Sequence, residues 1–238
     1  MDKQKILKKG ICFGMLWLAD YMMAQLYRDG NMETIFNGVA YGSRVYFYVL
    51  PFFVFACFSL YMHGEFEEYV CGMGVYRLIR EGRSRLFVRL AARLFLQLLA
   101  IGAIHISGYG CMCYAMIGKI YFGDWRLFVR FLIVNAFVYY FVFFVQMMLE
   151  LWMSGRIAMY ITMVYYLVSL FVGDMLYIAD NSLPHLQLFF LPNIAMRVRW
   201  EKIGNLLFGP GTEILLLTGI ICIIFFAGNF LFRKKDII

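Results

Sequence analysis

The chain has 238 residues, of which 63% are hydrophobic and 19% aromatic, and its formal net charge is +7 at pH 7. Soluble globular domains are about 45–50% apolar, and a chain of this length cannot bury a much larger share in its own interior. The composition therefore excludes a soluble globular domain. It predicts an all-α integral membrane protein whose surplus apolar side chains face lipid.

Six apolar segments lie along the chain, each near the roughly 20 residues that a membrane-crossing helix needs. The first follows the basic stretch MDKQKILKKG, and we expect it to be retained because Asp20 interrupts it and no small-residue cleavage site follows. Pro51 falls inside the second segment, where neighbouring helices can cover the carbonyl that it leaves unpaired. We expect a single transmembrane domain, residues 1–238, with spans at about 11–27, 45–62, 90–110, 127–149, 157–179 and 213–232.

The basic residues predict the orientation of these spans. Six spans place both termini on one side, and cytoplasmic termini make 1–10, 63–93, 151–156 and 232–238 the inner segments. These segments hold 14 of the 22 Lys and Arg residues, whereas the outer segments 28–44, 111–130 and 180–212 hold eight. Cytoplasmic loops are enriched in Lys and Arg, so the division favours cytoplasmic termini. The positive charge needs no nucleic acid to explain it.

The long inner loop contains a candidate docking helix. Apolar side chains recur there at three- and four-residue spacing, at Phe66, Val70, Met73 and Tyr76. Such a stripe suits a protein partner or the lipid interface, and a loop that only sets orientation and binds anionic headgroups is the alternative. Acidic residues beside the stripe favour protein docking; they are Glu65, Glu67 and Glu68. A turn is expected at Glu81–Gly82.

Several local patterns resemble the membrane subunit of a type-2 ABC exporter, and specifically the small permeases of bacteriocin and lantibiotic export and immunity systems. They are the basic amino-terminal segment, the acid-rich start of the loop helix, the R-x-G-R-S-R turn at 80–85 and the tail FRKKDII. The six-span pattern covers the whole chain, while motif identity is limited to 65–89 and the tail. The resemblance implies a multi-pass protein of the bacterial cytoplasmic membrane.

The same resemblance implies roles for the loop and for two other segments. The amino-terminal segment would lie along the inner leaflet, and the stretch before the last span would dip into the membrane from outside. Residues 181–211 suit that dip, because three prolines break their short apolar runs. The loop would form a coupling helix on the ATPase through Phe66, Glu67, Glu68, Tyr69, Tyr76 and Arg77. Arg83, Arg85, Arg89 and Arg93 would anchor its membrane side.

An ATPase motor is expected on a separate chain. No G-x-x-x-x-G-K-[ST] loop occurs in the sequence, so the nucleotide-binding subunit would carry ATP and Mg²⁺ and this chain no cofactor. Six spans would be half of a pore, which a second copy or a sister permease completes. The expected partners are therefore that ATPase, the second permease, membrane lipids and a hydrophobic or amphipathic peptide or lipid-like cargo. Nucleic acid is not among them.

Four polar side chains fall within or near the ends of the expected spans, where charge is costly and functional sites concentrate. We predict that they line the translocation path; a structural hydrogen bond or an end-of-span position is the alternative for each. They are Asp20, His105, Glu150 and Asp174.

Two other classes of function remain open at this stage. One is a non-transporting immunity or sensor protein that binds a peptide or lipid. The other is an intramembrane protease, for which Glu67–Glu68 resembles the start of E-E-x-x-x-R, but Gly72 replaces the arginine. The H-E-x-x-H signature is absent and the six cysteines show no metal-ligand spacing, so we expect no metal site and no catalysis on this chain.

Overall fold

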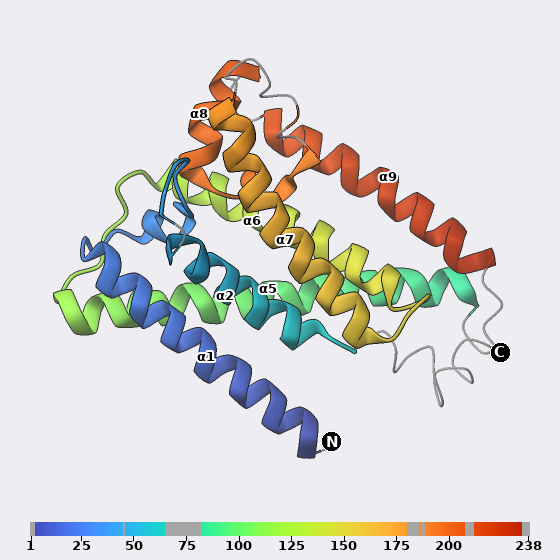
Figure 1. The fold of residues 1–238 in the computed structure, drawn as a ribbon. Coiled ribbons are helices and arrows are strands. Elements are labelled where there is room, and N and C mark those ends of the chain that lie inside the picture. The colour runs from blue at the N-terminus through green and yellow to red at the C-terminus, as the bar shows by residue number, and fades with distance from the viewer. Residues whose placement is uncertain are drawn as a thin grey trace.

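The computed structural model describes residues 3–44, 46–64, 82–179, 186, 189–207 and 212–234. These ranges are helical and contain no strand; their isolated bridge pairs Asn31 with Tyr121. The expected all-helical class is thus confirmed. The helices are α1 (Lys3–Tyr27), α2 (Tyr46–Met62), α5 (Arg83–Ile117), α6 (Trp125–Leu149), α7 (Gly155–Ala179), α8 (Arg197–Leu207) and α9 (Thr212–Lys234), with short 3₁₀ turns η1 (Met32–Phe36) and η3 (Leu191–Asn193) (Figure 1).

Four of the described helices, α5, α6, α7 and α9, are long and apolar enough to cross a membrane, and α2 is a shorter apolar helix. The chain is therefore a multi-pass membrane protein. Helix α5 has 35 residues and runs past the expected span 90–110 at both ends. At 1.5 Å per residue it is about 50 Å long. The hydrocarbon layer is only about 30 Å thick, so part of α5 lies outside it.

Successive long helices run in opposite directions, so the bundle has two distinct ends (Figure 1). At one of them, Lys8 Nζ donates to the carbonyl of His63 at 2.6 Å, and Glu150 accepts the Gly64 N–H at 3.1 Å. Arg83 Nη1 also donates to the Arg233 carbonyl at 2.6 Å. These bonds join the start of α1, the ends of α2, α6 and α9, and the start of α5. We call this the basic end.

The opposite end, called here the capped end, is tied together by η1. The Met32 N–H donates to the Tyr121 carbonyl at 3.0 Å, and the Tyr121 N–H donates to the Gly30 carbonyl at 3.1 Å. Glu33 accepts the Asp124 N–H and, at 2.7 Å, Arg197 Nη1. Burial disfavours the charged form of Arg197 and lowers its pKa. The hydrogen bonds and negative charges of Glu201 and Glu33 favour the charged form more strongly, so the net effect raises the pKa of Arg197. The loops after α1 and α5 are thus joined to α8.

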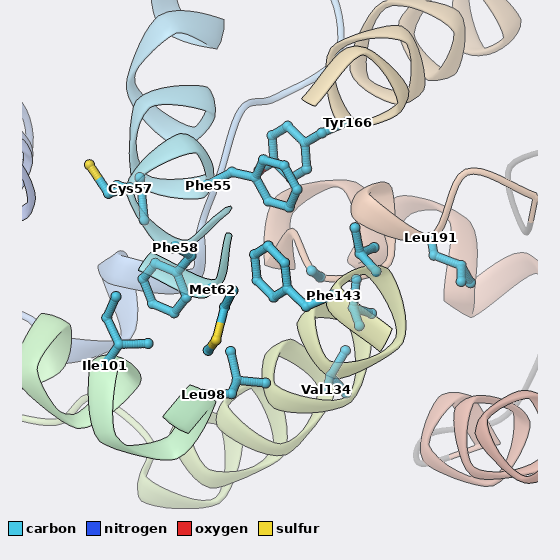
Figure 2. Packing of buried hydrophobic residues seen from close by; sticks show 14 of the residues in the cluster. Phe55, Cys57, Phe58, Met62, Leu98, Ile101, Val134, Phe143, Tyr166 and Leu191 are labelled. Carbon is cyan, nitrogen blue, oxygen red and sulfur yellow. The ribbon is translucent and has the colours of Figure 1, made fainter. Parts of the chain in front are cut away.

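Aromatic side chains pack the centre of the bundle. Phe55 lies between Tyr166 and Phe143, with ring centroids 4.0 and 5.3 Å away (Figure 2). These three residues come from α2, α7 and α6. Apolar side chains gain little over lipid tails by burial alone, so close fit holds such helices together. Gly228 of α9 supplies the same kind of fit, because a Cβ there would press on Phe87 at 3.1 Å.

The described part of the segment before α9 folds onto the capped end around Arg199, which is fully buried. Its Nε donates to the Val39 carbonyl at 2.7 Å, and its Nη1 donates to the Leu170 carbonyl at 3.0 Å and to Asn193 Oδ1 at 2.6 Å. Asn193 fits because Gly173 has no Cβ, which would otherwise overlap the amide. Arg199 therefore fastens α8 to α7 and to the loop after η1.

We predict that Arg199→Met lowers stability strongly. The change removes a donor from three buried acceptors, and breaking such a buried polar set costs about 3–5 kcal/mol. The Tm of the purified protein in detergent should fall by roughly 10 °C. Arg126→Met is the matched control because Arg126 is exposed, and its effect should stay within about 0.5 kcal/mol. Equal Tm shifts for the two variants would contradict the structural role of Arg199.

Candidate functional site

A cavity of about 460 Å³ lies inside the bundle, between α1, α2, α5 and α6. Residues of η1 and the Ala195–Met196 turn close it toward the capped end. None of its described lining side chains is Asp, Glu, Lys or Arg. Pockets of this size and apolar character are typical of sites for small apolar ligands. Its wall includes Leu50, Val54, Phe58, Leu98, Phe137 and Met196.

The polar group of greatest interest in the wall is His105, which lies next to Asp20. His105 lines the cavity, and its Nδ1 is 2.6 Å from Asp20 Oδ1. The Asp20 side chain is fully buried and that of His105 is 12% exposed. The contact is close but not aligned as a linear hydrogen bond, since neither atom has such a bond within the described residues. The pair joins α1 to α5 behind the cavity.

Local sequence explains why Asp20 points at α5. Buried residues of α1 recur at the three- and four-residue spacing of one helix face, at Leu16, Ala19, Asp20, Met23 and Ala24. The facing position on α5 is Gly108, where a Cβ would overlap Asp20 Oδ2. The absence of a side chain at Gly108 thus makes room for the carboxylate. His105, one turn earlier on α5, then lies within reach.

The remaining candidate path residues lie at the two ends of the bundle. Glu150 belongs to the basic end, where it accepts the Gly64 N–H. Asp174 belongs to the capped end, where its Oδ1 accepts the Gly42 N–H at 2.9 Å and lies 3.7 Å from Arg199 Nη2. The structure therefore brings Asp20 and His105 together and places Glu150 and Asp174 apart from them. Each of the latter two holds a loop.

The candidate anchoring arginines occupy the first three turns of α5, beginning with Arg83 beside the end of α9. Arg85 and Arg89 are exposed. Arg93 is partly buried. The candidate coupling residues, Phe66 to Arg77, lie outside the described residues.

One buried polar cluster was not foreseen from the sequence. Gln146 Oε1 accepts the Ser59 hydroxyl at 2.9 Å and the Thr162 hydroxyl at 3.1 Å. The cluster joins α6, α2 and α7, and all three side chains are buried. The available signal was a glutamine within the apolar run of α6. In the wall of the cavity, Asn135 Nδ2 likewise donates to the Ala195 carbonyl at 2.8 Å.

The fold and the site define an all-helical, multi-pass membrane protein with an internal apolar cavity and one buried carboxylate–imidazole pair in its wall. Among the residues that the structure describes, no group of three His, Cys, Asp or Glu side chains could hold a metal ion. Residues 13–238 match the family described as "Protein of unknown function (DUF2705)", and the chain belongs to that family. No curated protein and no solved structure matches the chain.

We predict that Gly108→Ala disturbs the Asp20–His105 pair. The added methyl overlaps the carboxylate, and overpacking of this kind costs about 1–3 kcal/mol. A measurable fall in Tm in detergent is expected. Gly102→Ala on the same helix is the control, because a Cβ there meets nothing within 4 Å; it should be neutral or slightly stabilising, since Ala favours helix over Gly. A Tm for Gly108→Ala equal to the wild type would show that the helices are not in this contact.

Proposed function

We propose that this chain is the permease subunit of an ABC exporter that moves a hydrophobic or amphipathic peptide, or a lipid-like molecule. The observation that carries the proposal is the cavity of about 460 Å³ inside the bundle, with its apolar lining and its one imidazole backed by a carboxylate. An apolar space between membrane helices suits a cargo that already partitions into the bilayer. The polar pair gives that space a point of recognition.

The proposed topology has six spans, with α1 and α2 as crossings in addition to the four long apolar helices, and both termini in the cytoplasm. Two observations support it. The long helices alternate in direction (Figure 1). The basic end gathers the starts of α1 and α5 with the end of α9, which together hold ten of the 22 Lys and Arg residues. By the positive-inside rule, the basic end would face the cytoplasm of a bacterial cell.

The motor and the other half of the pore are proposed to come from other chains. A nucleotide-binding ATPase would carry ATP and Mg²⁺, and a second copy or a sister permease would complete the pathway. The loop between α2 and α5 would hold the ATPase through its apolar and aromatic stripe. The exposed arginines at the start of α5 would contact anionic lipid headgroups, which attract Lys and Arg at the inner leaflet.

A second function is favoured by the fact that the helices of one chain line the whole described cavity. A non-transporting immunity or sensor protein would bind a peptide or lipid in the same cavity and would need no motor. The two functions differ in whether an ATPase associates with the chain. Purification of the tagged chain from its native membrane, followed by mass spectrometry of the bound proteins, separates them.

The topology is testable with a reporter that is active only in the cytoplasm. We predict activity for fusions after Lys235 or at Gly82 and none for fusions at Asn31 or Asn205, because basic loops stay inside. A reporter active only outside should give the reverse pattern at the same four positions. Cytoplasmic activity at Asn205 would contradict the six-span arrangement.

The docking loop is testable by co-purification. Interface energy concentrates in a few aromatic and arginine residues, each worth 2 kcal/mol or more. Phe66→Ala with Tyr76→Ala should therefore weaken ATPase binding by at least about thirtyfold and abolish cargo-stimulated ATP hydrolysis. Arg83→Ala with Arg85→Ala is the matched control on the membrane side, and it should leave the ATPase bound. Wild-type recovery of the ATPase with the aromatic double variant would show that this loop is not the coupling element.

A further inference from the structure

The Asp20 carboxyl group is enclosed between α1 and α5, beside His105. Both of its oxygens are buried and neither makes an aligned hydrogen bond within the described residues. Among the described residues, the side chain that pairs with it is His105, whose Nδ1 lies 2.6 Å from Asp20 Oδ1. A lone charge in such a place costs several kcal/mol or more, so the two side chains must share a net charge of zero.

Two proton arrangements make the pair neutral without leaving a buried carboxyl hydrogen unpaired. Either a carboxylate faces an imidazolium, or a protonated carboxyl group donates to Nδ1 of a neutral imidazole. A third, in which Nδ1–H faces a protonated carboxyl group, is disfavoured because neither Asp20 oxygen has another hydrogen-bond partner among the described residues. In the first arrangement both ring nitrogens carry hydrogen. In the second, Nδ1 accepts and the ring's one hydrogen is on Nε2. His105 Nε2 therefore carries a hydrogen in both cases, and the pair presents a donor there regardless of where the shared proton lies.

The ring geometry directs this donor away from Asp20. The two nitrogens of an imidazole point in diverging directions, so a ring whose Nδ1 faces Asp20 has its Nε2 on the other side. His105 is part of the cavity wall, and Phe58, another wall residue, meets the ring edge-on at 6.0 Å between centroids. No hydrogen bond to Nε2 occurs within the described part of the chain. The cavity thus combines an apolar lining with an N–H donor.

The wall also shows how a ligand reaches this donor. Leu99 of α5 and Ile133 of α6 line the cavity and are 46% and 36% exposed, so the cavity is partly open between these two helices. Both helices are long and apolar enough to cross a membrane, so this opening faces the bilayer. A ligand arriving by this route comes from lipid and is uncharged, because a charged group would lose its hydration there.

We infer that the cavity binds an uncharged amphiphile from the bilayer, whose ester carbonyl oxygen accepts a hydrogen bond from His105 Nε2 while its alkyl chain fills the apolar part. The inference rests on the proposed function, in that the cavity is taken as the cargo site. It adds the class of cargo and the group that selects it. Asp20 is a positioning residue in this scheme, because it acts on the ligand only through His105.

Two tail-matched photoreactive probes test the inference on the purified full-length chain in lipid nanodiscs. One is a diazirine-bearing palmitic acid methyl ester, and the other is the corresponding diazirine-bearing hydrocarbon. Mass spectrometry of the labelled peptides gives the yield of each probe on cavity residues. The ester preference is the ratio of ester labelling to hydrocarbon labelling. One hydrogen bond of ordinary strength should make this ratio roughly threefold to tenfold higher in the wild type than in His105→Phe. His105→Gln, whose amide can still donate, should retain at least part of the preference.

Cavity-filling variants separate this inference from the proposed function. Ala136→Phe and Ala103→Phe both place a ring in the cavity, and each should lower the labelling of both probes. If they do so while His105→Phe keeps the wild-type ester preference, the donor role of His105 is wrong and the cavity remains the cargo site. If neither filling variant lowers the labelling, the cavity is not a ligand site, and the proposed function fails with the inference. Elution of every variant as one monodisperse peak excludes misfolding as the cause.

Discussion

Water is absent from the hydrocarbon layer, so polar side chains inside the bundle must find their partners within the protein, and two groups of them find these on other helices. Asp20 of α1 meets His105 of α5, and Gln146 of α6 collects hydroxyl groups from α2 and α7. Apolar contacts alone would not choose between these neighbours, because lipid tails are as apolar as the side chains that they replace. The polar pairs therefore specify which helices lie together, and the aromatic packing fills the spaces that they leave.

At the two ends of the bundle, polar contacts fix loops and helix ends to one another. At the capped end, Glu33 joins η1 to the start of α6 and to α8, while Arg199 joins α8 to α7. Loops that are far apart in sequence are thereby fixed to one another. At the basic end, Lys and Arg side chains bond to the last carbonyls of other helices, as with Arg83 and Arg233. Cations are favourable there because helix carboxyl ends carry partial negative charge.

Much of the helical layout could be predicted, because length and hydropathy are local properties of the sequence. Each expected span falls in a helix, and the interior position of Asp20 followed from charge in an apolar run. The pairing of Asp20 with His105 could not be predicted, since residues on separate helices share no sequence spacing. Arg199 was foreseen only as an outer basic residue; its burial depends on Tyr41, Asn193 and the missing Cβ of Gly173, which meet only in three dimensions.

The length of α5 has a mechanical consequence. A continuous helix transmits rotation and translation along its axis, and this one runs without a break from Arg83 to Ile117. His105 lies about 33 Å along it from Arg83 at 1.5 Å per residue. A displacement of the arginine-rich start of this helix would therefore also displace the part of the cavity wall that contains His105.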